Sequence, residues 1–93
     1  MLFDKTQIGG IDAKCRIIRS ATFEGMADTN GFPTERLLQN YATLADGGSG
    51  IIITGMMAVS PMEPHQHSQI RISSDDFIEP LQKLTACVHE HGG

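Results

Sequence analysis

Residues 16–61 read RIIRSATFEGMADTNGFPTERLLQNYATLADGGSGIIITGMMAVSP, and this stretch decides the fold of the chain. A short β-branched strand at 16–19 is followed by a polar loop, a helix and an apolar strand at 50–54. Each strand runs directly into a loop of small and polar residues. This order is typical of a βαβ unit, in which ligands bind at the carboxyl ends of the parallel strands.

The helix of this unit has clear boundary signals. Thr34 is a favourable N-cap residue, and Gly47-Gly48 is a typical helix end. The strand at 50–54 shows no alternation of apolar and polar residues, which predicts a parallel strand covered on both faces. One face of the helix is apolar and is formed by Leu37, Leu38, Tyr41, Leu44 and Ala45.

The segments on either side of this unit are also predictable. Residues 1–13 form two short apolar runs around Gly9-Gly10, which favours a hairpin. Residues 56–74 are expected to be a long connection whose last residues, from 73 onward, begin a turn or short helix. A second helix is expected at 80–91, with Pro80 at its first position. Its apolar positions are Leu81, Leu84, Ala86 and Val88.

Composition excludes several classes of function. The 93 residues make one small domain or part of a larger one, and 40% hydrophobic content is typical of a globular protein. A net charge of −4 argues against nucleic-acid binding. No apolar run approaches the ~18 residues of a membrane span, and no signal peptide is visible. Cys15 and Cys87 are expected to be free thiols in a reducing cytoplasm.

Four short segments of the chain have a distinctive order and spacing. They are KCRII at 14–18, NGFPT at 30–34, GGSGIII at 47–53 and AVSP at 58–61. Each motif alone is short, but together they resemble the Old Yellow Enzyme family of FMN-dependent NAD(P)H oxidoreductases, and the resemblance covers nearly the whole chain.

The resemblance implies a (β/α)₈ TIM barrel, an α/β fold that needs ~250 residues. Residues 1–13 would be its N-terminal hairpin, and 14–93 its first two βα units, so the barrel would be incomplete. The implied activity is transfer of hydride from NAD(P)H through N5 of FMN to an activated alkene or a related small-molecule acceptor. Most of the active site would lie outside these 93 residues, so the chain alone is expected to be inactive.

The resemblance also implies which residues lie near the flavin. By position, Ser20, Ala21, Thr22 and Phe23 would contact the cofactor from the loop after the first strand. Met56 would lie beside the flavin at the end of the second strand. No catalytic residue and no metal ligand is assigned within the chain.

Other interpretations remain open. The segment 20–23 also suits a plain loop between strand and helix, and Arg16 and Arg19 suit ion pairs at the bottom of a barrel. An alternative function is a non-catalytic interaction module, in which several chains complete the sheet through exposed edges. A further alternative is a metal site formed by two His-x-His pairs, at 65–67 and 89–91.

Overall fold

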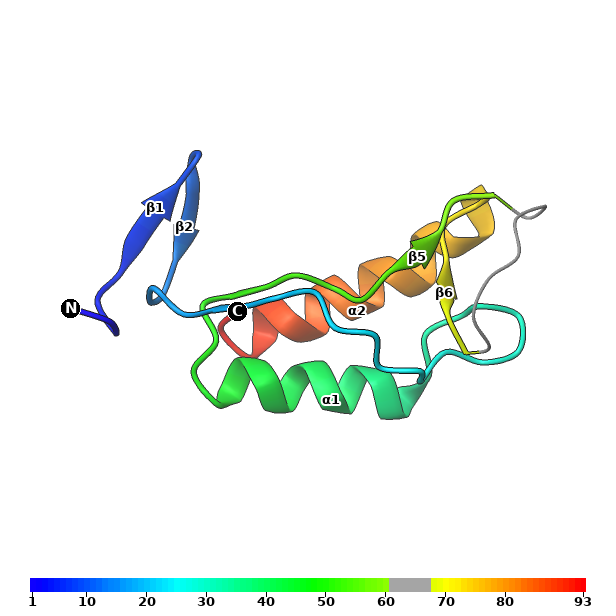
Figure 1. Ribbon diagram of the computed structural model, residues 1–93, viewed down its shortest axis with the longest axis horizontal. Coiled ribbons are helices and arrows are strands. Elements are labelled where there is room, and N and C mark those ends of the chain that lie inside the picture. The colour runs from blue at the N-terminus through cyan, green and yellow to red at the C-terminus, as the bar shows by residue number, and fades with distance from the viewer. Residues whose placement is uncertain (61–67) are drawn as a thin grey trace.

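The computed structural model describes residues 1–60 and 68–93. Nine short elements follow one another in these ranges, and three separate two-stranded sheets pair β1 with β2, β3 with β4 and β5 with β6 (Figure 1). The elements are β1 (Thr6–Ile8), β2 (Ile11–Ala13), β3 (Ile18–Arg19), α1 (Glu35–Asp46), β4 (Ile51–Ile52), β5 (Met57–Ala58), β6 (Ile70–Arg71), the 3₁₀ helix η1 (Asp75–Phe77) and α2 (Ile78–Glu90).

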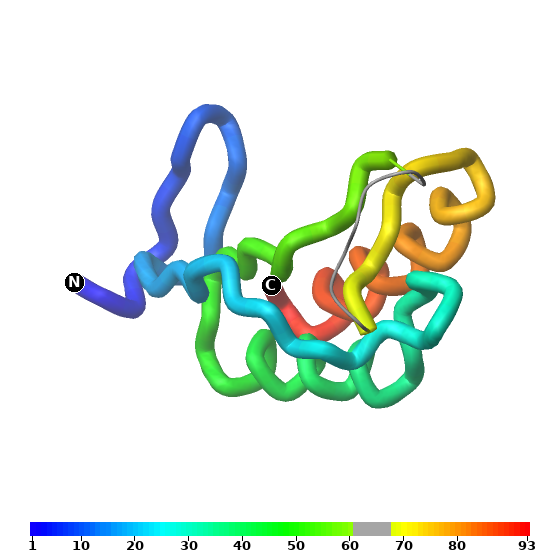
Figure 2. Tube along the Cα trace, turned by 45° about the vertical axis from the view of Figure 1, so that its right-hand side comes forward, coloured from blue at the N-terminus to red at the C-terminus, as the bar shows by residue number. Residues whose placement is uncertain are grey.

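The predicted N-terminal hairpin is confirmed. Strands β1 and β2 pair antiparallel, with Ile8 opposite Ile11. Gly9 and Gly10 have φ values of 56° and 86°, a conformation that glycine adopts without steric cost. Both views show the hairpin projecting away from the two helices (Figure 1, Figure 2). It therefore contributes little to the core of the chain.

Helix α1 forms where the sequence predicts it. The Thr34 side chain accepts a hydrogen bond from the Leu37 backbone N–H at 3.2 Å, and Gly47 is the C-cap residue. Leu37, Tyr41 and Ala45 are buried, as expected from their spacing. Burial of this stripe holds the helix against the rest of the chain, because an isolated 12-residue helix is marginal in water.

The parallel pairing of the two predicted strands is also confirmed, but both strands are shorter than expected. Ile18 lies opposite Ile51, and Arg19 lies opposite Ile52. Arg19 and Ile52 face α1, since Ile52 packs on the core and the Arg19 guanidinium lies over the Tyr41 ring. The other face is open, and Ile18 is 46% exposed. The expectation that both faces are covered is therefore wrong for the described residues, because helices lie on one side only.

Residues 56–74 contain a strand pair that the sequence analysis missed. Strands β5 and β6 pair parallel, with Met57 opposite Ile70, and Ile70 is buried in the core. Two-residue strands carry no alternation pattern, so only the pairing itself reveals them. The predictions that concern Pro61 and the His65–His67 pair fall outside the described residues.

Helix α2 begins two residues earlier than predicted, directly after η1. Pro80 therefore occupies the third helical position, where a missing N–H still costs no intrahelical bond. Leu84 is buried against α1, as expected. Ala86 is exposed, however, and Cys87 instead turns inward and donates its S–H to the Leu38 carbonyl at 3.6 Å. Both cysteines are free thiols, as predicted.

Candidate functional site

The five residues predicted to lie near a ligand are all exposed, and they follow the carboxyl ends of β3 and β4. Ser20, Ala21, Thr22 and Phe23 come directly after β3, and Met56 comes four residues after β4. Phe23 and Met56 line the same small hollow, about 10 Å³ in volume, although they belong to different loops. Their side chains are 42% and 48% exposed. The fold thus brings the predicted residues to the same end of the strand pair, at the carboxyl ends of β3 and β4.

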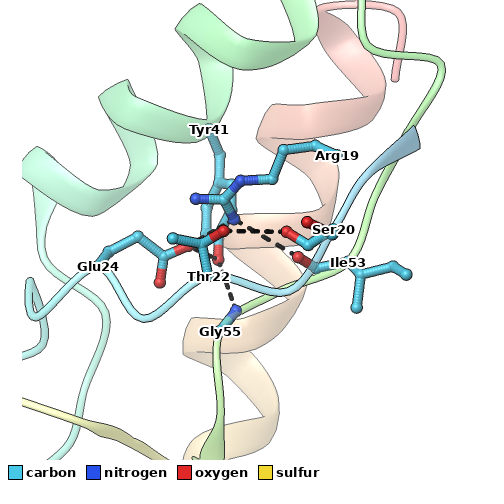
Figure 3. Close-up of polar contacts among 7 residues, drawn as sticks. All are labelled: Arg19, Ser20, Thr22, Glu24, Tyr41, Ile53 and Gly55. Atoms are coloured by element: carbon cyan, nitrogen blue, oxygen red, sulfur yellow. Dashed lines mark hydrogen bonds and ion pairs between the residues drawn. The ribbon is translucent and has the colours of Figure 1, made fainter. Parts of the chain in front are cut away.

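The loop after β3 is held by its own polar groups. The Thr22 hydroxyl donates to the Ser20 carbonyl at 3.2 Å (Figure 3). Glu24 forms an ion pair with Arg19 at 2.9 Å, and the Glu24 side chain is only 6% exposed. The Arg19 Nη1 also donates to the Ile53 carbonyl at 3.5 Å. The loop is therefore tied back to β3 and to the residue that follows β4.

Arg19 forms an ion pair, as one interpretation of the sequence expected. The ion pair lies at the carboxyl end of β3, however, whereas it was expected at the opposite end, which forms the bottom of a barrel. Arg16 is exposed and forms no ion pair with the residues that the structure describes. Neither arginine is therefore a barrel-bottom ion-pair partner within the described residues.

Tyr41 links this loop to the end of β4. Its hydroxyl donates to Glu24 Oε1 at 2.6 Å and accepts a hydrogen bond from the Gly55 N–H at 3.3 Å (Figure 3). The side chain is fully buried in α1. Burial, reinforced by the bond to the Glu24 carboxylate, raises the pKa of Tyr41 to about 12. The phenol is thus neutral and serves as a fixed donor at neutral pH.

Gly55 is the point of closest approach between the two loops. A Cβ atom at this position would lie 2.5 Å from the Thr22 carbonyl oxygen and 2.6 Å from Glu24 Oε2. Contacts below 3.0 Å force a displacement, and the Thr22 oxygen is backbone, which cannot swing aside. A residue without a side chain is therefore required here. Met56, next along the chain, lines the hollow.

Comparisons with known proteins place this arrangement in a family. No family model matches the chain. The N,N-dimethylglycine/sarcosine dehydrogenase of Chromohalobacter salexigens is 34% identical over 99% of the chain, which spans 14% of that enzyme. The solved old yellow enzyme homologue from Zymomonas mobilis is 30% identical with a TM-score of 0.85, over 99% of this chain and 25% of that one.

The chain belongs to the Old Yellow Enzyme family. An NADPH dehydrogenase from a Geobacillus species supports this, with 31% identity over 99% of the chain and 27% of the relative. Membership implies a TIM-barrel parent, of which the described elements form a small α/β part. The chain spans between about one seventh and just over a quarter of these relatives.

The exposed residues fit a flavin, the cofactor that this family implies. A flat heterocycle needs an apolar surface, which Phe23 and Met56 provide, and small neighbours that let backbone groups approach, such as Ser20 and Ala21. Gly55 does not offer an open position, because the loop after β3 fills the space where its side chain would be.

Sequence reasoning missed Glu24, Tyr41 and Gly55. Tyr41 was assigned to the apolar face of the helix, which is correct for its ring. A buried tyrosine hydroxyl nearly always requires a hydrogen-bond partner, and this requirement was the available signal. Between residues 20 and 27, the first part of the loop after the first strand, Glu24 is the only residue with a carboxylate. Glu24 could therefore have been inferred as the hydrogen-bond partner of the Tyr41 hydroxyl, but the hydrogen bond between that hydroxyl and Gly55 could not.

The metal hypothesis gains no support from the described residues. Within 1–60 and 68–93, no three histidine, cysteine or acidic side chains gather in a way that holds a metal. His91 pairs instead with Asp46, with 2.9 Å between Nδ1 and Oδ1. His65 and His67 lie outside the described residues. Among the described residues there is also no helix long and apolar enough to cross a lipid bilayer.

Proposed function

We propose that this chain forms the N-terminal part of the FMN site in an NAD(P)H-dependent oxidoreductase barrel. Residues 1–13 would be its hairpin, and 14–93 its first two βα units. The observation that carries the proposal is the gathering of exposed small and apolar residues at the carboxyl ends of two parallel strands, where barrel enzymes of this type bind ligands. When bound, FMN would accept hydride from NAD(P)H and pass it to an activated alkene or a related acceptor.

Within this site the chain's own residues would bind and orient. Phe23 and Met56 would pack on the edge of the ring system and exclude water from it. Backbone groups of Ser20 to Thr22 would approach the polar edge of the flavin, where hydrogen bonds tune its electronics. Glu24 is the carboxylate that lines the hollow, but its side chain is only 6% exposed and is bonded to Arg19 and Tyr41, and no described histidine lines the hollow. The 93 residues alone are therefore proposed to lack catalysis.

Binding of FMN to the purified chain tests the proposal. Flavin fluorescence is expected to be quenched on titration with the chain, and Phe23→Ser and Met56→Ser are expected to weaken binding by about tenfold each, since each removes most of a buried apolar contact. Ile8→Ser in the distant hairpin is the matched control and is expected to leave the affinity unchanged. Equal affinity in all three variants would contradict the assigned site.

A turnover assay tests the second part of the proposal. The chain with added FMN is expected to oxidise NADPH no faster than free FMN does. Turnover above that level would show that the 93 residues carry a working active site, and would contradict the proposed inactivity.

A second candidate is favoured by the open face of β3–β4. Ile18 and Ile53 are about half exposed on that face, and neighbouring chains that add strands at the exposed edges could close the sheet around it. This interaction module would be an oligomer. Light scattering at high protein concentration tests it: a strict monomer argues against the module, while a defined oligomer that dissociates on Ile53→Ser supports it.

A further inference from the structure

The network of Arg19, Glu24, Tyr41 and Gly55 joins the two loops that border the proposed flavin site. Tyr41 is fully buried and does not line the hollow, so its side chain cannot touch a ligand there. Glu24 lines the hollow, but its side chain is only 6% exposed. Glu24 Oε1 nevertheless accepts from both Arg19 and Tyr41. Any effect of the Tyr41 hydroxyl on ligand binding must therefore act through the position of the loops and of Glu24.

The Tyr41 hydroxyl links the two loops, as does Arg19, whose Nη1 donates to both Glu24 and the Ile53 carbonyl. The hydroxyl donates to Glu24 in the loop after β3 and accepts from the Gly55 N–H after β4. The absence of a side chain at Gly55 lets the loops touch, and the Tyr41 hydroxyl forms hydrogen bonds to both of them from the side of α1. We propose that Tyr41 and Glu24 are positioning residues that hold the two loops at a fixed separation, and so set the affinity of this edge for a flavin. The inference rests on the proposed function.

Removing only the hydroxyl separates this role from a role in the core. Tyr41→Phe keeps the ring against α2 and beneath the Arg19 guanidinium, which lies 5.8 Å from its centroid. It leaves the Gly55 N–H without its partner and Glu24 with Arg19 alone. An unpaired buried group costs more than a surface hydrogen bond is worth, so the loops are expected to rearrange while the helices stay packed.

Two measurements on the full 93-residue chain test the proposal. The first is hydrogen exchange of the Gly55 amide followed by nuclear magnetic resonance, and the second is titration with FMN. In Tyr41→Phe, exchange at Gly55 is expected to rise by about tenfold, and the dissociation constant for FMN is expected to rise by a similar factor. The matched control is Thr43→Val on the same helix, because the Thr43 hydroxyl is exposed and bonds only to Gln39 within α1. Both quantities are expected to stay unchanged in it.

The outcomes separate this inference from the proposed function. If the wild-type chain and Tyr41→Phe bind FMN equally well, the positioning role is overturned and the proposed function stands. If the wild-type chain binds no FMN, the proposed function fails for this chain, and exchange at Gly55 decides the positioning role. Faster exchange confined to Gly55 and residues 20–25 supports it, while unchanged exchange overturns it.

A second variant keeps the test decisive if Tyr41→Phe does not fold. Glu24→Gln retains an acceptor for the Tyr41 hydroxyl but removes the charge, and hydrogen bonds to charged acceptors are roughly twice as strong. Exchange at Gly55 is then expected to rise by about threefold. No change in exchange would overturn the role of Glu24 in holding the loops.

Discussion

The two faces of the β3–β4 pair differ in what covers them. On one face Arg19 lies over the Tyr41 ring, and Ile52 is partly buried against the core cluster that includes Leu37 and Tyr41. On the other face Ile18 and Ile53 are about half exposed, although they are as apolar as Ile52. The strands are thus built for burial on both sides, and the described residues supply only one of the two layers.

This difference shows where the stability of the chain resides. The helix side carries the close packing and the buried polar network. The open side carries apolar residues without a described neighbour, as the inner strands of a barrel would before its other strands are added. Substitutions on the two faces should therefore have very different effects on the chain alone.

The largest effect is expected at Leu37 on the closed face. Leu37→Ala is expected to lower the free energy of unfolding by about 2–5 kcal/mol, because it leaves a cavity in the only described core cluster. Urea unfolding followed by circular dichroism measures this. A loss below about 1 kcal/mol would show that the helix side is loosely packed, and would weaken the contrast between the faces.

Alkaline unfolding probes the polar group on the same face. An unfolded tyrosine loses its proton near pH 10.0, whereas Tyr41 in the fold keeps it until about pH 12. Unfolding therefore releases a proton between these values, and stability is expected to fall by about 1.4 kcal/mol per pH unit across the window. Below pH 10, Tyr41 does not contribute to the pH dependence of the free energy of unfolding. Urea unfolding at stepped pH should show the slope in the wild type and lose it in Tyr41→Phe.

The junction between the loops should tolerate no side chain. Gly55→Ala places a methyl group 2.5 Å from the Thr22 carbonyl oxygen, and the resulting displacement is expected to cost about 1–3 kcal/mol. Gly47→Ala is the matched control, because its φ of −73° suits alanine and its new Cβ would lie 3.1 Å from the nearest atom. Equal melting temperatures for the two variants would contradict the close contact at Gly55.

The smallest effect is expected on the open face. Ile53→Ser is expected to change the free energy of unfolding by less than about 0.5 kcal/mol in the dilute chain, since Ile53 is already half exposed. Its neighbour Ile52 packs on the core, and Ile52→Ser is expected to cost about 1–3 kcal/mol. Equal losses for these adjacent residues would show that the open face is covered in solution.

Local signals were sufficient for most of the fold. The turn at Gly9-Gly10, the N-cap at Thr34 and the parallel pairing around α1 follow from the backbone preferences and periodicity of nearby residues. The family resemblance added the location of the candidate site, and the comparisons confirm the family. Which of the exposed residues contact a flavin stays a prediction.

Tertiary structure decided what local signals do not encode. The pairing of β5 with β6 joins residues 13 positions apart in register, and the inward turn of Cys87 in place of Ala86 depends on how α2 rests on α1. The link from Tyr41 through Glu24 to Gly55 depends on the stacking of α1 beneath two loops.

The sequence alone thus determined the N-terminal hairpin, the two helices, the parallel pair around α1, the order of these elements and the family of this chain. Each of these is specified by neighbouring residues, since capping, periodicity and turn chemistry act over a few positions. Only the tertiary structure decided that one face of the strand pair is closed, that the other is open, and that a buried tyrosine hydroxyl bonds to both loops. Those features depend on distances between elements that are far apart in the sequence, and these distances are set only when the helices pack.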